Sequence, residues 1–182
     1  MYKTEEVVQL KKKVIASPGD YIVAKGYLAC KTGQQFIYFA KQGDTILVTT
    51  SVCENSLYFE AKSDVILIRM PEERSLVLFN RRNEWNERLM ARMALRIQFY
   101  ALPAKERLYI LLFQMGKEIG ISSGADCFIP NMVTQQELGV YINCTREYLC
   151  AVKRKLVLDG WIDRGKGWKL LDWERWVKNW GA

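Results

Sequence analysis

The 182-residue sequence contains no histidine. This absence excludes Ser-His-Asp triads, Cys-His nucleophile pairs and every metal site that uses imidazole ligands. A phosphate-binding glycine loop and clustered carboxylates are also missing. We therefore expect no enzyme activity, no cofactor and no metal site.

Cysteine is sparse, and no two cysteines have Cys-x-x-Cys spacing. The five cysteines are Cys30, Cys53, Cys127, Cys144 and Cys150. An odd, scattered set indicates reduced thiols in a cytoplasmic protein. Cys30 and Cys53 admit two interpretations, a redox pair or buried inert thiols, and the second is favoured.

Long hydrophobic runs are missing as well. No run of about eighteen apolar residues is present, so no membrane span is expected. Residues 1–6, Met-Tyr-Lys-Thr-Glu-Glu, do not resemble a signal peptide.

Positive charge is in excess and unevenly placed. The net charge of +7 divides into +1 in residues 1–80, +4 in 81–107, −1 in 108–129 and +3 in 130–182. A basic surface attracts the phosphate backbone of nucleic acids, although charge alone fits a generic solvated surface equally well.

Residues 134–143 predict a short helix followed by a tight corner. Thr134 and Glu137 have the spacing of a capping box, and Leu138 and Ile142 fall on one helical face. Asn143 suits a left-handed corner. The adjacent Gly139 offers a small surface for close approach of a second helix.

A second helix is predicted from Thr145 as its cap, with Glu147 in the first turn. Its expected buried face is Leu149, Val152 and Leu156. The outer side is then left to Arg146, Tyr148, Lys153 and Arg154. Together the two segments predict a helix-turn-helix whose second helix enters the DNA major groove.

A basic β-hairpin is predicted directly after this helix. Asp159 and Gly160 end the helix with a left-handed glycine, and two apolar segments, 161–164 and 168–171, flank Gly-Lys-Gly at 165–167. A hairpin in this position is a wing.

The motifs Thr-Gln-Gln-Glu-Leu-Gly, Cys-Thr-Arg-Glu-Tyr and Gly-Trp-Ile, at 134–139, 144–148 and 160–162, resemble the C-terminal domain of the cAMP-receptor-protein/FNR (Crp/Fnr) regulators. The resemblance is clearest over residues 102–171. It implies that Thr145, Arg146 and Glu147 meet phosphate and base edges. Ala151 stands where many members carry a further Arg, so the base sequence preferred by the best-known members is not expected here.

The expected DNA contacts follow from side-chain chemistry. Glu147 accepts from cytosine N4, and Arg146 bonds guanine O6 and N7 or takes phosphate. Tyr148 and Ala151 are candidates for a thymine methyl. The expected phosphate contacts are Thr145, Gln135, Gln136, Lys153, Arg154 and, at the wing tip, Lys166.

Short strands separated by turn residues are expected between residues 21 and 69, which favours a sandwich or barrel. Residues 1–13, which end in Lys11–Lys13, are expected to form a solvated basic tail; a frayed arm or a short strand-helix element is the alternative. The resemblance implies an α+β fold with a shortened cupin-like β-roll sensor domain in residues 1–80. It implies a dimerisation helix in residues 81–101 and a winged helix-turn-helix in residues 102–182. No Arg or Lys lies between Asp44 and Ala61, so a cyclic nucleotide is not the expected ligand.

Helices are expected at residues 71–79 and 84–101, with a break at 80–83. The apolar stripe of the longer helix is Trp85, Leu89, Met93, Ile97 and Tyr100. The resemblance favours a two-fold helix pair through this stripe; packing within one chain is the alternative.

The remaining expectations concern residues 103–180. A helix begins after Pro103, residues 116–126 form a loose connection, and 127–130 with 132–133 form a small strand pair. A terminal helix is expected over 172–180. Trp173, Trp176 and Trp180 recur on it at helical spacing, which favours core packing, with a partner surface as the alternative.

The sequence therefore predicts a homodimeric, sequence-specific regulator that binds a palindromic operator in double-stranded DNA. RNA polymerase and an unidentified small effector are further candidate partners. The alternatives are a winged-helix protein-interaction module or a DNA-binding protein that needs no effector.

Overall fold

The structure, a computed structural model, describes residues 6–48, 57–70, 76–165 and 167–181. It divides into two compact units, Met1–Phe99 and Tyr100–Ala182. Among the described residues, no helix combines the length and the apolar character needed to cross a membrane.

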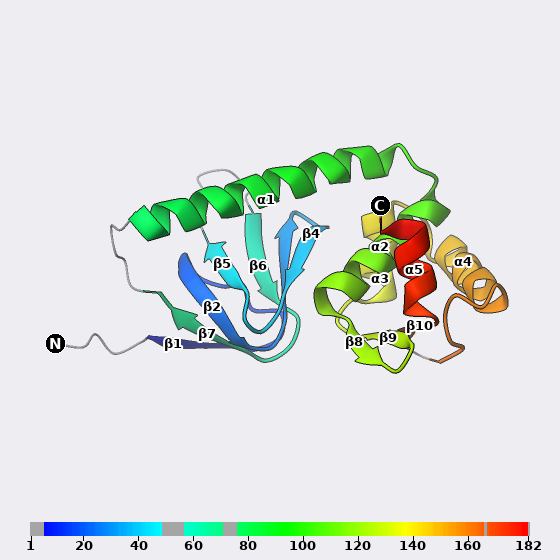
Figure 1. Cartoon of the computed structure of the whole chain (residues 1–182), viewed down its shortest axis with the longest axis horizontal. Coiled ribbons are helices and arrows are strands. Elements are labelled where there is room, and N and C mark those ends of the chain that lie inside the picture. Colours follow the sequence, from blue (N-terminus) through cyan, green and yellow to red (C-terminus); the bar gives the residue numbers. More distant parts are fainter. Residues whose placement is uncertain (1–5, 49–56, 71–75, 166, 182) are drawn as a thin grey trace. The chain divides into compact units, whose positions relative to one another are not determined.

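The first unit is built from two antiparallel sheets and one long helix (Figure 1). The strands are β1 (Val7–Leu10), β2 (Gly19–Lys25), β3 (Leu28–Thr32), β4 (Gln35–Ala40), β5 (Thr45–Val48), β6 (Leu57–Ala61) and β7 (Val65–Arg69). One sheet has the order β1-β7-β2-β5 and the other β4-β3-β6. The strands expected between residues 21 and 69 are confirmed, apart from residues 49–56, which lie outside the described part.

Side chains from both sheets fill the interior of this unit. Tyr21 and Val23 of β2, Leu28 of β3 and Leu67 of β7 are fully buried, and Phe59 of β6 is 1% exposed. Alternate residues of a strand point to opposite faces, so each strand contributes its apolar face to one shared core.

The expectation of a solvated tail at the start of the chain is wrong in part. Residues 7–10 form β1, which pairs with β7 from Val7 opposite Ile68 to Leu10 opposite Val65. The edge of β7 supplies backbone partners that the local sequence does not reveal. Lys11, Lys12 and Lys13 are exposed, but they lie in a turn and not in a tail, because the Lys13 amide donates to the Ala61 carbonyl over 2.7 Å. Lys11 forms an exposed ion pair with Asp64.

Helix α1 (Leu76–Tyr100) is continuous, so the predicted break at residues 80–83 is wrong. Residues 80–83 contain neither Gly nor Pro, and polar residues alone lower helix propensity by only about half a kcal/mol each. Packing of the helix against the sheets offsets such a cost. The predicted helix start at Pro71 lies outside the described residues.

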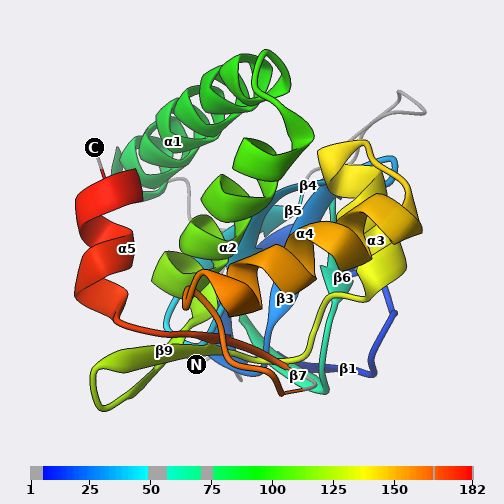
Figure 2. The same ribbon diagram turned by 90° about the vertical axis from the view of Figure 1, so that its right-hand side faces the viewer.

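The second unit contains four helices and a small sheet (Figure 2). Its elements are α2 (Ala104–Ile119), β8 (Ile121–Ser123), β9 (Asp126–Ile129), α3 (Gln135–Ile142), α4 (Arg146–Leu158), β10 (Trp168–Leu170) and α5 (Trp173–Trp180). The sheet has the order β10-β9-β8. Together the two units confirm the predicted α+β class with a β-roll and a helix-turn-helix.

Residues 116–126 are not the loose connection that the sequence predicts. Helix α2 runs through Gly116 to Ile119. A Cβ at Gly116 would lie 2.6 Å from the ring of Trp173, so only glycine lets that ring approach the helix. Gly124, with φ +64°, makes the turn between β8 and β9.

Of the strand pair expected from residues 127–130 and 132–133, only the first strand is confirmed, as β9. Strand β9 pairs with β8 and β10 instead, while Met132 and Val133 are buried outside any strand. Both segments, 127–130 and 132–133, were predicted as strands because they are apolar. Apolar composition indicates that a segment is buried, but not that it pairs with another strand.

The terminal helix α5 packs as predicted. Trp176 is fully buried, and its ring contacts those of Tyr109 and Trp161. Trp173 stacks on Phe113 with ring centroids 5.3 Å apart. The indole Nε1 of Trp176 donates to the carbonyl of Trp161 over 3.3 Å, which links α5 to the segment that follows α4.

Candidate nucleic-acid interface

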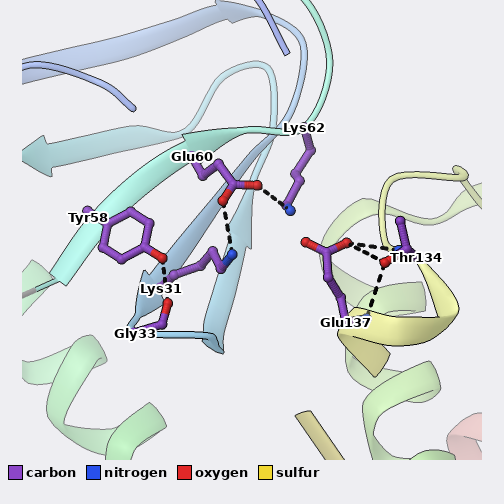
Figure 3. A network of polar contacts seen from close by, with 7 residues as sticks. All are labelled: Lys31, Gly33, Tyr58, Glu60, Lys62, Thr134 and Glu137. Carbon is purple, nitrogen blue, oxygen red and sulfur yellow. Dashed lines mark hydrogen bonds and ion pairs between the residues drawn. The ribbon is translucent and has the colours of Figure 1, made fainter. Parts of the chain in front are cut away.

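The predicted capping box at the start of α3 is present. Thr134 Oγ1 accepts from the Glu137 amide over 3.2 Å, and Glu137 Oε2 accepts from the Thr134 amide over 2.9 Å (Figure 3). Two otherwise unpaired backbone donors are satisfied in this way.

The corner between α3 and α4 has the predicted left-handed residue. Asn143 has φ 51° and ψ 62°. The Cys144 amide donates to the Gly139 carbonyl over 2.9 Å, and a Cβ on Gly139 would lie 3.2 Å from the Cys144 carbonyl oxygen. Gly139 therefore accommodates the backbone of the turn, not a second helix as the sequence suggested.

Helix α4 begins and packs as predicted. Thr145 Oγ1 accepts from the Tyr148 amide over 3.3 Å. Leu149, Val152 and Leu156 are buried against the rest of the unit.

The C-terminal end of α4 is fixed by two backbone hydrogen bonds. Gly160 has φ +68°, its amide donates to Val157, and the Trp161 amide reaches back to the Leu156 carbonyl over 2.9 Å. These two bonds form a Schellman motif, which satisfies carbonyls at the helix end.

An outward strip of α4, opposite its buried face, consists of Glu147, Ala151, Arg154 and Leu158, all exposed. At 3.6 residues per turn these positions fall on one line along the helix. Arg146 and Tyr148 are exposed beside this strip. Leu158, 80% exposed, is a member of the strip that the sequence reasoning did not single out.

The Glu147 carboxylate is held in its ionised form. Hydrogen bonds from its own backbone amide and from the Thr145 hydroxyl lower its pKa, and the charge of Arg146 adds to this effect. An ionised carboxylate is acceptor-only, which suits an amino group such as cytosine N4.

The predicted outer position of Lys153 is correct only in part. The side chain is half-buried, and Nζ lies 4.6 Å from the centroid of the Trp168 ring. Gln135 and Gln136 are exposed in the first turn of α3. Lys166 lies outside the described residues.

The wing is a short hairpin attached to a larger sheet. The Asp163 amide donates to Lys169 over 3.0 Å, and the Leu171 amide donates to Trp161 over 2.9 Å. β10 also pairs with β9, from Trp168 opposite Ile129 to Leu170 opposite Cys127. The sequence predicted the hairpin but not the pairing of its second strand, β10, with β9.

Two of the five residues predicted for a dimer contact pack inside the chain instead. Leu89 is buried, and Trp85 packs against the β-roll core with its Nε1 donating to the Tyr38 hydroxyl over 2.9 Å. Arg92, one turn further on, places its guanidinium 4.4 Å from the Tyr38 ring. This face of α1 is therefore an intrachain face.

A second apolar stripe of α1 is exposed. Phe79, Met90 and Ile97 are 61%, 66% and 75% exposed. At about 100° per residue these three positions lie within about 20° of one another. Of the predicted set, Ile97 belongs to this stripe, Met93 is half-buried beside it, and Tyr100 is 43% exposed.

No disulfide joins two of the described cysteines. Cys30 is fully buried, as the favoured interpretation expected, and Cys53 lies outside the described residues. Burial raises the pKa of Cys127 and of Cys144.

A cavity of about 480 Å³ lies between the β8–β9 hairpin and the start of α5. Two carboxylates that line it already have partners: Asp126 pairs with Lys169 at 2.8 Å, and Asp172 accepts from the Arg175 amide over 3.1 Å. Among the described residues no group of three or more metal-ligating side chains comes together.

Solved structures with this fold match nearly the whole chain. A CRP/FNR-family transcriptional regulator from Thermus thermophilus is 19% identical with a TM-score of 0.72, over 97% of this chain and 99% of that one. A cyclic nucleotide-binding domain-containing protein from Listeria monocytogenes is 15% identical with a TM-score of 0.71, over 93% and 90%. FixK2 from Bradyrhizobium japonicum is 18% identical with a TM-score of 0.66, over 97% of each chain. No family model and no curated protein matches the sequence.

The chain thus has the fold of the CRP/FNR transcriptional regulators, with an antiparallel β-roll, a long helix and a winged helix-turn-helix. At these identities the likeness shows the fold, and the fold alone does not specify a site. The fold expectation from the sequence motifs is confirmed.

Proposed function

We propose that this protein is a DNA-binding transcriptional regulator of the Crp/Fnr type that binds a palindromic operator as a homodimer. The observation that carries the proposal is the construction of α4. Its buried face and both ends are fixed by the chain, while Glu147, Ala151 and Arg154 form an exposed strip with Arg146 beside it. A rigid helix with an exposed polar strip is what major-groove recognition requires.

In the proposed complex Glu147 accepts from cytosine N4, and Arg146 bonds guanine or a neighbouring phosphate. Tyr148 and Ala151 contact a thymine methyl. Thr145, Gln135, Gln136, Arg154 and the wing lysine Lys166 contact phosphates and fix the register. Lys153, whose Nζ lies 4.6 Å from the centroid of the Trp168 ring, contacts phosphate with this ammonium group.

The proposed dimer contact is the exposed stripe of α1. Phe79, Met90 and Ile97 recur with spacings of eleven and seven residues, which a two-helix contact accommodates. In such a dimer, two α1 helices pack about a two-fold axis. The two α4 helices, one from each protomer, then bind half-sites that lie about one DNA turn apart.

We propose that the β-roll does not bind a cyclic nucleotide, because the sequence between Asp44 and Ala61 contains no Arg or Lys to meet a phosphate. A small effector of other chemistry, and contact with RNA polymerase, are compatible with this function. The proposed location is the cytoplasm.

Selection of bound duplexes from a random pool, under reducing conditions at near-physiological salt, tests the proposal. A two-fold symmetric motif with half-sites about one helical turn apart is the expected result. An asymmetric motif contradicts the dimer, and no enrichment together with salt-insensitive retention favours a protein-interaction module.

A further inference from the structure

The exposed side of α1 contains two asparagines among its apolar residues. Seven positions along this side are separated alternately by four and three residues: Phe79, Asn83, Asn86, Met90, Met93, Ile97 and Tyr100. All seven are exposed except Met93, which is half-buried. We call them the heptad seam, because alternation of four and three is the pattern of a helix that packs along its length on another helix.

A second copy of α1 is the partner whose chemistry matches the heptad seam. The seam spans three heptads, with Asn83, Met90 and Ile97 at a positions and the other four residues at d positions. Two identical helices can therefore cover each other's apolar residues, each side chain entering a hole of the other helix. An Asn at an a position lowers stability but specifies the number of strands and their register.

The two asparagines find partners in a parallel pair of helices in register. Asn83 then lies opposite Asn83 of the second copy, and Asn86 lies opposite Asn86. Each amide group has a donor and an acceptor facing it. A parallel pair shifted by one heptad places the asparagines opposite Met90 and Met93 instead, where a buried amide lacks a hydrogen-bond partner.

Antiparallel alignments are less favourable. With full overlap of the two seams, the asparagines lie opposite Ile97 and Met93, which again leave buried amides without a partner. Matching the asparagines with each other restores the hydrogen bonds, but the seams then overlap only from Phe79 to Met90. The apolar residues beyond Met90 would stay in water, so much of the hydrophobic contribution would be lost.

Charges beside the heptad seam favour the parallel alignment as well. Arg82 and Glu87 occupy a g and an e position five residues apart, the spacing at which opposite charges of two parallel helices in register meet. Arg82 Nη2 lies 2.8 Å from the Asp20 carboxylate, yet the Arg82 side chain is 58% exposed, and Glu87 is exposed. Both charged groups are therefore accessible to the second copy.

We propose that Asn83 and Asn86 fix the α1 dimer as a parallel pair in register, in which each amide hydrogen-bonds to the same residue of the second copy. The inference rests on the proposed homodimer and names the residues that set its register. The parallel pair brings together the C-terminal ends of the two α1 helices, where each chain continues into its second unit. An antiparallel pair with full overlap would separate the two Tyr100 residues by about 30 Å along the axis.

The sequence prediction of the dimer contact did not include the asparagines. It selected residues for apolar character, and two of its five members pack inside the chain. The asparagines join the contact only once the structure shows which side of α1 is exposed.

Disulfide cross-linking of the full chain tests the alignment with both asparagines intact. Ile97→Cys places two thiols opposite each other in the parallel pair in register, whereas in the antiparallel pair each thiol faces Asn83. Leu95→Cys is the matched control, because Leu95 is 56% exposed on the same helix but about 160° around the axis from Ile97. The wild-type chain accounts for cross-links through its own cysteines. We expect a covalent dimer on non-reducing gels in Ile97→Cys, and no more than the wild-type amount in Leu95→Cys.

The role of the asparagines is tested in the Ile97→Cys background. Asn83→Leu with Asn86→Leu removes the polar layers, so parallel and antiparallel pairs become similarly favourable, and the cross-linked fraction is expected to fall about twofold. The thermal midpoint is expected to rise, because polar layers lower the stability of a helix pair. Glu84→Leu with Arg88→Leu is the matched control: it adds two leucines to exposed positions away from the seam and keeps the net charge. This control should retain the cross-linked fraction of Ile97→Cys.

Each contrary result has a distinct meaning. A dimer by light scattering that does not cross-link through Ile97→Cys would overturn the parallel alignment and leave the homodimer intact. An unchanged cross-linked fraction after both Asn→Leu substitutions would show that the asparagines do not set the register. A wild-type chain that is monomeric by light scattering would overturn the proposed homodimer and this inference together.

Discussion

At the scale of single residues, Glu147 has the clearest expected role. Its carboxylate is ionised and exposed on the outward strip of α4. Glu147→Ala is expected to relax base preference at one position of each half-site, with a loss of about 1–3 kcal/mol of discrimination there. Duplex selection with the variant measures this directly.

Glu174→Ala, an exposed substitution on α5, is the matched control and is expected to leave the motif unchanged. An unaltered motif in Glu147→Ala would show that Glu147 does not read a base.

Glu60 is the second informative residue. Its carboxylate lies between Lys31 and Lys62, 2.9 Å and 2.5 Å from their Nζ atoms, and both lysines are buried (Figure 3). Burial alone would raise the pKa of Glu60, but the hydrogen bonds and charges of the two lysines outweigh it, and the pKa is lowered from 4.5.

Because the pKa of Glu60 is lowered in the folded state, we expect the first unit to lose stability in acid. Above pH 4.5 Glu60 is ionised in both states, and its contribution to the free energy of unfolding is fully present. The contribution is lost as the pH falls through the lower pKa of the folded state. Glu60→Gln is expected to flatten the pH dependence of stability in that window.

At neutral pH Glu60→Gln is expected to cost about 2–3 kcal/mol, because two buried ammonium groups lose their carboxylate. The free energy of unfolding from urea titrations at several pH values checks both effects. Glu84→Gln, which removes an exposed i, i+4 pair with Arg88, is the control and should change stability by less than about 0.5 kcal/mol. Equal effects of the two substitutions would contradict the role given to Glu60.

At the scale of elements, α1 has one apolar face on the β-roll and a second stripe that is exposed. Met90→Glu with Ile97→Glu places two charges on the exposed stripe. We expect this double variant to be monomeric by light scattering and to bind duplex at least about a hundredfold more weakly, because it loses the second half-site contact.

Leu95→Glu is the matched control for this experiment. Leu95 is 56% exposed, on the same helix, but about 160° around the axis from Ile97. A dimer in the double variant, or a monomer in Leu95→Glu, would place the two-fold contact elsewhere.

At the scale of the whole molecule, control by a ligand requires that the ligand bind two arrangements of the chain with different affinity. The described interior of the β-roll is occupied by its own side chains: Tyr21 and Leu28 are fully buried, and Phe36 and Phe59 are 1% exposed. We expect cyclic AMP to leave both duplex affinity and the thermal midpoint unchanged.

Anisotropy titrations and thermal scans with and without cyclic AMP measure the two quantities. A thermal midpoint that rises with cyclic AMP concentration would show binding to the folded state and would contradict the expectation.

Much of the candidate interface followed from local sequence. Capping residues at Thr134 and Thr145, the left-handed Asn143 and the Gly160 helix end act through bonds to residues within a few positions, so the sequence contains both partners of each interaction. The β-strands of the first unit were found for a similar reason, since alternation and turn residues are local signals.

Tertiary structure decided what depends on partners distant in the chain. β1 needs the edge of β7, and the Trp173 ring packs on α2 at Gly116, where it leaves no room for a Cβ. Trp85 and Leu89 share a helical stripe with Ile97 in the sequence, yet the β-roll covers the first two and leaves the third exposed. Periodicity indicates that a face is apolar, and only the packed chain determines which part of that face another copy is free to contact.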